Sequence, residues 1–123
     1  MGWGSNNIDG GVVIDLGLIN NIAYDAATET VDLGPGARWR EVYSELQKYG
    51  RAVAGGRDGD VGVGGLLLGG GNTYFTARKG FACDNVISYE VILADGRITT
   101  ADKYKHADLF RVLKGAGGEY KGD

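Results

Sequence analysis

The residues most suited to hold a ligand are nine glycines within residues 55–71, which we call the glycine-rich segment. Glycine lacks a Cβ atom, so backbone of this composition can adopt positive φ and approach another backbone or a flat ligand closely. Its N–H groups are then available as hydrogen-bond donors. We expect this segment to act as a surface made of backbone, either packed tightly against the protein or in contact with a ligand.

The spacing of these glycines fits none of the common ligand-binding loops. After Gly62 and Gly64, Leu67 stands where a dinucleotide-binding fingerprint has its third glycine, and no Gly-Lys-Ser/Thr sequence follows. Asp58 begins a stretch that resembles a calcium loop, but its twelfth position is Gly69 in place of glutamate. Spacing alone therefore leaves both interpretations open, tight packing and ligand contact.

The side chains that most often perform catalysis do not form a catalytic set. His106, the single histidine, precedes a predicted helix and is expected to be exposed. Cys83, the single cysteine, is followed by Asp84, whose charge disfavours a thiolate, so we expect a half-buried, inert thiol. Asp84 and Asn85 lie between Gly80 and a strong strand pattern, where such residues usually form turns. We predict no catalytic residue and no metal site.

The most clearly helical part of the chain is residues 38–49, followed by Gly50 where a left-handed residue would end the helix. Before it, a β-branched run at residues 12–16 predicts a short buried strand. Residues 22–25 and 30–33 predict a hairpin. The apolar stripe of the helix has the spacing i, i+3, i+4, i+7 and consists of Trp39, Val42, Tyr43 and Leu46.

After the glycine-rich segment, residues 73–79 predict one or two helical turns. Residues 86–94 carry the strongest strand pattern, and Asp95-Gly96 predicts a hairpin turn to residues 97–100. Residues 107–114 predict a short helix. These elements indicate an α+β fold in which a mixed, mostly antiparallel sheet is flanked by short helices.

Length and charge limit the classes of function. A chain of 123 residues forms one domain. Its net charge of −3, without a run of Lys or Arg, argues against a nucleic-acid partner. No apolar run approaches the roughly 20 residues that span a bilayer, so we expect no membrane partner either.

Five stretches in register resemble a known family. They are Asn7 to Leu16 (NIDGGVVIDL), Gly34 to Trp39 (GPGARW), Val61 to Gly71 (VGVGGLLLGGG), Lys79 to Gly96 (KGFACDNVISYEVILADG) and Ala107 to Gly115 (ADLFRVLKG). Together they resemble the FAD-binding, PCMH-type domain of vanillyl-alcohol-oxidase-type FAD-linked oxidoreductases, in particular the fungal branch similar to berberine-bridge enzymes and 6-hydroxynicotine oxidase. Each motif alone is weak, but five in this order and spacing are specific.

The resemblance implies FAD as the cofactor and the second FAD-binding subdomain as the fold. In that family the flavin lies between two subdomains, so the glycine-rich segment would contact it through backbone, with apolar contact from Val61 and Val63. The residues implied to lie beside the cofactor are Val61, Gly62, Val63, Gly64, Gly65, Asp84, Asn85, Val86 and Ile92.

Departures from the family pattern suggest that residues 1–123 form one partial subdomain. Members begin with a subdomain whose Gly-Gly-His loop holds the FAD pyrophosphate, and no histidine precedes His106. Some members attach the flavin to a cysteine where this chain has Asp58, so covalent flavin is not expected. Without the pyrophosphate loop and the substrate domain, we expect weak or absent FAD binding and no oxidase turnover.

Two other interpretations remain at this stage. The chain could be a non-catalytic interaction module that self-associates, or binds a partner, through the face that the missing subdomains would cover. It could also complement a separately encoded flavin subdomain. Each of these two interpretations assumes that the chain is an incomplete FAD-binding domain.

Overall fold

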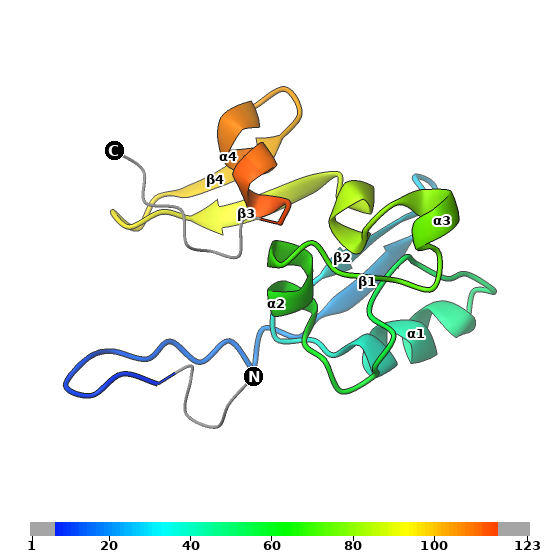
Figure 1. Ribbon diagram of the computed structural model, residues 1–123, viewed down its shortest axis with the longest axis horizontal. Coiled ribbons are helices and arrows are strands. Elements are labelled where there is room, and N and C mark those ends of the chain that lie inside the picture. Colours follow the sequence, from blue (N-terminus) through cyan, green and yellow to red (C-terminus); the bar gives the residue numbers. More distant parts are fainter. Residues whose placement is uncertain (1–6, 116–123) are drawn as a thin grey trace.

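The computed structural model describes residues 7–115, which form an α+β fold as predicted (Figure 1). Within these residues the strands pair as two separate antiparallel hairpins, and short helices connect and flank them. The elements in chain order are β1 (Ile22–Asp25), β2 (Thr30–Leu33), α1 (Trp39–Gln47), α2 (Val63–Leu68), α3 (Thr76–Lys79), the 3-10 helix η1 (Ala82–Asn85), β3 (Ser88–Ile92), β4 (Ile98–Asp102) and α4 (Ala107–Leu113).

The predicted first hairpin is confirmed: β1 and β2 pair from Ile22 opposite Leu33 to Asp25 opposite Thr30. Asp25 fixes the turn between them, because its carboxylate accepts hydrogen bonds from the Thr28 hydroxyl at 2.7 Å and the backbone N–H of Ala27 at 2.8 Å. These bonds lower the pKa of Asp25.

Helix α1 supplies the centre of the core. Trp39, Val42 and Leu46 are at most 2% exposed, and they pack with residues of the first hairpin and with Val63 of α2. The predicted apolar stripe is therefore the buried face.

The predicted end of α1 is also confirmed. Gly50 has φ of 63° and donates its N–H to the carbonyl of Gln47, while Arg51 donates to the carbonyl of Leu46. These two bonds form a Schellman motif, which satisfies carbonyl groups at the helix end.

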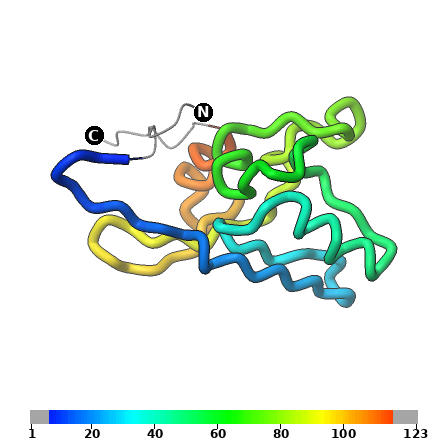
Figure 2. The backbone as a smooth tube through the Cα atoms, turned by 90° about the horizontal axis from the view of Figure 1, so that it is seen from below, coloured from blue at the N-terminus to red at the C-terminus, as the bar shows by residue number. Residues whose placement is uncertain are grey.

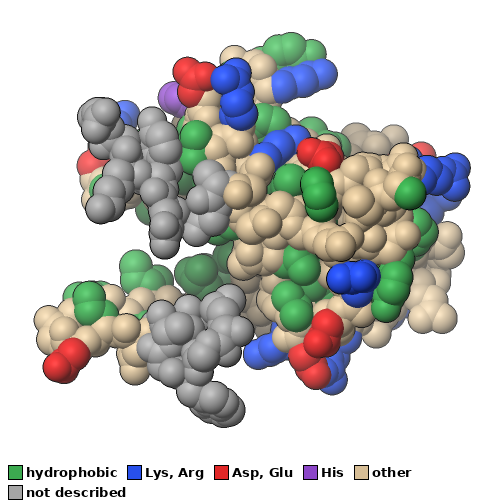
Figure 3. Space-filling model, viewed as in Figure 1, with side chains coloured by type: hydrophobic (Ala, Val, Ile, Leu, Met, Phe, Trp, Pro, Cys, Tyr) green, Lys and Arg blue, Asp and Glu red, His purple; other side chains and the backbone are tan. Residues whose placement is uncertain are grey.

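The predicted strand at residues 12–16 is wrong. Most of this stretch belongs to an N-terminal arm, residues 8–15, that extends from the body of the fold (Figures 1 and 2). Val12 is 87% exposed and Ile14 79%, and hydrophobic side chains lie on the surface of the arm (Figure 3). A β-branched run favours extended backbone, but a strand also needs a neighbour to pair with, and no other described segment pairs with these residues.

The second hairpin forms where Asp95-Gly96 predicted it, although β3 is shorter than the predicted strand at residues 86–94 and β4 extends beyond the predicted residues 97–100. Tyr89 of β3 lies opposite Ala101 of β4, and Gly96 in the turn has φ of 81°. Helix α4 covers one face of this hairpin, where the rings of Phe110 and Tyr89 lie 5.9 Å apart between centroids. Nowhere in residues 7–115 is a helix long and apolar enough to cross a membrane.

Candidate functional site

The glycine-rich segment runs from the chain that follows α1 to the 3-10 helix η1. It leaves the core after α1, turns at residues 57–60, and pairs with the loop before α1 through a bridge between Gly62 and Arg38. It then forms α2 and ends against η1. The short apolar run that could not form a helix alone does so here because Val63 is buried in the core.

The first part of the segment serves packing. A Cβ atom added to Gly55 would lie 2.2 Å from the Trp39 ring, and one added to Gly56 would lie 2.5 Å from it. Tyr43 fixes the same stretch by donating its hydroxyl hydrogen bond to the carbonyl oxygen of Gly56 at 2.6 Å. These two glycines are therefore required by the indole that packs on them.

The end of the segment also needs glycine for packing. A Cβ atom on Gly71 would lie 2.3 Å from Leu66, and Gly71 has φ of 76°. Its carbonyl accepts a hydrogen bond from the N–H of Ala82 at 2.8 Å, and the carbonyl of Gly70 accepts one from Cys83 at 3.0 Å. The segment is thus joined directly to η1.

The middle of the segment has a different environment. A Cβ atom on Gly62 would meet nothing within 4 Å, and its φ of −71° is open to any residue. Val61 is 38% exposed and Gly65 is exposed. Packing and backbone conformation within the described residues therefore do not explain glycine at position 62.

Backbone hydrogen bonds hold this middle part in place and leave three N–H donors without an acceptor. Val63 donates its N–H to the carbonyl of Ala37 at 2.9 Å, and Trp39 donates to that of Val61 at 3.2 Å. No acceptor within residues 7–115 bonds to the N–H groups of Gly62, Gly64 and Gly65, at the start of α2. Such first-turn groups have no partner inside the helix, so they can bond to water or a ligand.

The side chain of Val63 is not exposed to a ligand, although the resemblance implied that it would contact the flavin. It is 2% exposed and faces the core, so only its backbone can contribute to a surface site. The expected apolar contact is available from Val61 alone.

Asp84 and Asn85 stabilise the turn that carries them. The Asp84 carboxylate accepts a hydrogen bond from the N–H of Phe81 at 2.8 Å, and the Asn85 amide donates to the carbonyls of Lys79 and Phe81. Both side chains are exposed, and Val86 behind them is half-buried. Their predicted role as turn formers is confirmed.

Most of the implied residues lie on two elements that contact each other, α2 and η1, and one lies apart. Gly70 and Gly71, which follow α2, accept hydrogen bonds from Cys83 and Ala82 at the start of η1. Ile92 is the last residue of β3, which runs away from η1 (Figure 1), and it is 69% exposed.

His106 is exposed as predicted, whereas Cys83 is more deeply buried than the half-buried position predicted for it. Cys83 is 5% exposed, and burial together with the charge of Asp84 raises the pKa of its thiol. His106 is exposed at the start of α4. Within the described part of the chain, no cluster of His, Cys, Asp or Glu could hold a metal ion.

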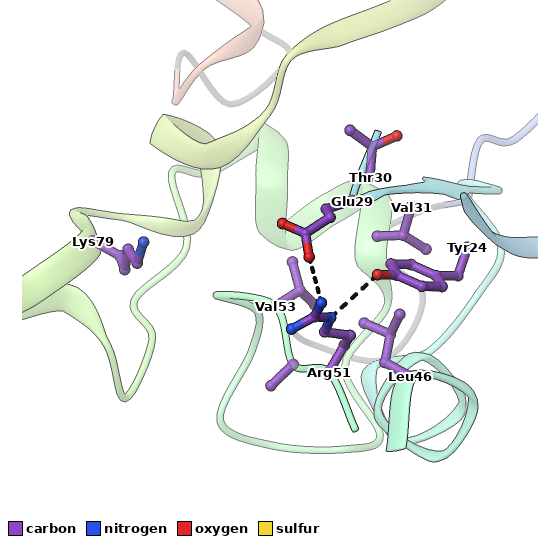
Figure 4. Close-up of a pocket in the computed structure, with 9 residues that line it drawn as sticks. Tyr24, Glu29, Thr30, Val31, Leu46, Arg51, Val53 and Lys79 are labelled. Atoms are coloured by element: carbon purple, nitrogen blue, oxygen red, sulfur yellow. Dashed lines mark hydrogen bonds and ion pairs between the residues drawn. The ribbon is translucent and has the colours of Figure 1, made fainter. Parts of the chain in front are cut away.

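Sequence reasoning missed two features. The Trp39 indole Nε1 is buried without a hydrogen-bond partner, beside Gly56. A pocket of about 430 Å³ also lies between the first hairpin and the chain that follows α1 (Figure 4). Its lining comes from several separate segments, so no single motif could have indicated it.

Comparisons with known proteins give a consistent result. The chain matches the family described as FAD binding domain over residues 1–102. The FAD-dependent monooxygenase drtC of Aspergillus calidoustus is 48% identical over 115 residues, 94% of this chain and 22% of the relative. The FAD-dependent monooxygenase tpcD of Cochliobolus heterostrophus is 43% identical over 95% of this chain and 23% of the relative. The chain thus spans less than a quarter of these relatives.

Solved structures share the fold. The 6-hydroxy-D-nicotine oxidase of Arthrobacter nicotinovorans superimposes with a TM-score of 0.87 at 33% identity, over 93% of this chain and 25% of that one. Glucooligosaccharide oxidase of Acremonium strictum superimposes with a TM-score of 0.84 at 33% identity, over 94% of this chain and 24% of that one. A further structure of the latter names its cofactor as 6-S-cysteinyl, 8α-N1-histidyl FAD.

Proposed function

The chain belongs to the FAD binding domain family, and from this we propose that residues 61–65 and 84–86 form one wall of the FAD site of an FAD-linked oxidoreductase. The observation that carries the proposal is the contrast within the glycine-rich segment. Gly55 and Gly56 are explained by the Trp39 ring, whereas Gly62 has open space beside it. A ligand lying against the backbone at Gly62 accounts for a glycine that packing does not require.

The chemistry of the exposed groups fits a flavin. The N–H groups of Gly64 and Gly65 are donors suited to the carbonyl oxygens and ring nitrogens at the polar edge of a flavin. Val61 is exposed enough to contact the apolar side of the ring. FAD, when bound, supplies the acceptor for a hydride from the substrate.

Asp84 and Asn85 would act through the shape of their turn. Their side chains bond to the backbone of residues 79–81, so they hold η1 in place beside the glycine-rich segment. Ile92 lies at the far end of β3, and we do not include it in the wall.

We propose that the attachment is non-covalent. A thiolate that attacks a flavin must be accessible, and Cys83 is 5% exposed with a raised pKa. Asp58 is exposed in the turn before Val61, where its carboxylate accepts the N–H of Asp60, and a carboxylate offers no comparable thioether linkage.

The affinity of residues 1–123 for FAD is proposed to be weak, because the wall is exposed and offers few donors. The test is to mix the protein with excess FAD, measure flavin fluorescence at equilibrium, and then record the visible spectrum after desalting. We expect saturable quenching and loss of the yellow colour on desalting. Retained flavin would contradict weak binding, whereas absence of saturable quenching would overturn the site itself.

A further inference from the structure

Three Asp-Gly pairs occur in the chain, at residues 9–10, 58–59 and 95–96, and each of the three aspartates is exposed. An aspartate before glycine is open to attack on its own side chain, because glycine has no Cβ atom to keep its backbone nitrogen away from the carboxyl group. The nitrogen bonds to Cγ, water leaves, and a five-membered succinimide ring forms. Water then opens the ring at either carbonyl and gives aspartate or isoaspartate, whose main chain runs through Cβ. No other reactant is needed.

The structure restrains both reacting groups of Asp95-Gly96. The Asp95 carboxylate accepts hydrogen bonds from the backbone N–H of Arg97 at 3.1 Å and from its Nε at 2.6 Å. These bonds lower the pKa of Asp95 and so keep the carboxyl group in its ionised form, which a nitrogen attacks less readily. The N–H of Gly96 donates to the carbonyl of Leu93 at 2.8 Å within the hairpin turn. Attack therefore requires several bonds to open.

Asp58-Gly59 is restrained mainly through the glycine. The Asp58 carboxylate accepts one hydrogen bond, from the N–H of Asp60 at 2.9 Å. The carbonyl of Gly59 accepts the N–H of Arg40 at 3.0 Å, and a Cβ atom on Gly59 would lie 3.0 Å from that of Arg40. This peptide is thus packed against the first turn of α1, which limits its rotation.

Asp9-Gly10 has none of these restraints. No hydrogen bond or ion pair within residues 7–115 involves the Asp9 carboxylate or the N–H of Gly10. A Cβ atom on Gly10, which has φ of 66°, would meet nothing within 4 Å. Both residues are exposed and belong to the N-terminal arm. The glycine nitrogen can therefore reach Cγ of Asp9 without breaking a contact between described residues.

We propose that Asp9-Gly10 is a site of spontaneous isomerisation to isoaspartate, whereas the bonds that hold Asp95-Gly96 protect that pair and Asp58-Gly59 reacts at an intermediate rate. Isomerisation adds the Cβ methylene of Asp9 to the main chain of the arm. Because the arm extends from the body of the fold, the change leaves the core intact. The proposal does not rest on the flavin site.

The experiment ages the protein at pH 7 and 37 °C, in buffer and in guanidinium chloride, and then digests it with trypsin. The three pairs fall on separate peptides, residues 1–38, 58–78 and 80–97, and enzymatic methylation of isoaspartate with a labelled methyl donor quantifies each. We expect Asp9 to react at similar rates in both solvents. Asp95 should react at least about fivefold more slowly in the native protein, the factor for one net hydrogen bond. Equal rates for Asp95 in the two solvents, or equal protection of Asp9 and Asp95, would overturn the proposal.

Three variants test the assignment. Asp9→Glu cannot form the five-membered ring and should remove isoaspartate from peptide 1–38. Asp15→Glu changes another exposed aspartate of the same arm, one followed by leucine, and is the matched control that should leave the signal unchanged. Arg97→Ala should raise the rate at Asp95 in the native protein by about two- to fivefold, because a bond to the carboxylate is lost. Isoaspartate that persists in Asp9→Glu, or an unchanged rate at Asp95 in Arg97→Ala, would contradict these roles.

Discussion

The Trp39 indole occupies the space that a side chain at Gly55 would fill: a Cβ atom there would lie 2.2 Å from Cε3 of the ring. Trp39 is 1% exposed and lies at the centre of the core. Seven residues further along, a Cβ atom added to Gly62 would meet nothing within 4 Å. The glycine-rich segment therefore has two roles along its length, packing at residues 55–56 and an open backbone surface around residue 62.

Alanine substitutions should separate these roles. We expect Gly55→Ala to lower the free energy of unfolding by about 2–3 kcal/mol, because the core must move to admit a methyl group. Gly62→Ala should cost no more than about 1 kcal/mol, the difference between glycine and alanine at a helix N-cap. Urea denaturation followed by tryptophan fluorescence measures both. Equal losses would show that position 62 is also fixed by packing.

The N-terminal arm should contribute little to stability in residues 1–123. Ile14→Thr should change the free energy of unfolding by less than about 0.5 kcal/mol, as is usual for surface substitutions. Val42→Ala, in the core at 0% exposure, is the matched control and should cost about 2 kcal/mol or more. If both variants lost similar stability, Ile14 would have to be buried.

Local sequence patterns correctly predicted the elements that pack or pair with other described residues. The stripe from Trp39 to Leu46 and the Asp95-Gly96 turn each carry their own signal, and both are found where expected. The run at residues 12–16 carries an equally clear signal, but pairing depends on a neighbour that the sequence pattern does not specify. Local propensity therefore indicated extended backbone correctly and burial wrongly.

The candidate site was predictable only in part for the same reason. Glycine spacing could not separate residues that pack on Trp39 from Gly62, because that distinction depends on which side chain lies opposite. The resemblance indicated Val63 as an apolar contact, whereas its side chain is in the core. The pocket at Arg51 and Lys79 combines residues 28 positions apart, and nothing in either local sequence indicates the other.

The thiol of Cys83 should react slowly in the folded protein. Burial, with the nearby charge of Asp84, raises its pKa and so lowers the thiolate fraction at neutral pH. We expect modification by a disulfide reagent at pH 8 to be at least about tenfold slower in the native protein than in urea. Equal rates would mean that η1 opens readily and that the thiol is accessible.

Tyr89 should make stability fall at alkaline pH. Burial raises the pKa of its half-buried hydroxyl from 10.0 to about 12. Between these values the unfolded chain releases a proton that the folded protein retains, so the stabilisation is complete below pH 10 and is lost as pH rises towards 12.

Tyr89→Phe should reduce this loss of stability, and urea denaturation at intervals between pH 9 and pH 11.5 measures it. Tyr104→Phe removes a hydroxyl from a side chain that is 84% exposed and is the control. If the free energy of unfolding of Tyr89→Phe fell with rising pH as steeply as that of the parent protein, a group other than Tyr89 would be responsible.

Mapping of FAD on backbone amides tests the central proposal most directly. Titration of ¹⁵N-labelled protein with FAD should give saturable shifts concentrated at residues 61–65 and 84–86, and Gly62→Ala should weaken them while its fold stays intact. Shifts around Gly64 and Gly65 would support their N–H groups as donors to the cofactor. Absence of saturable shifts, or shifts located at the Arg51 pocket with none at residues 61–65, would contradict the account.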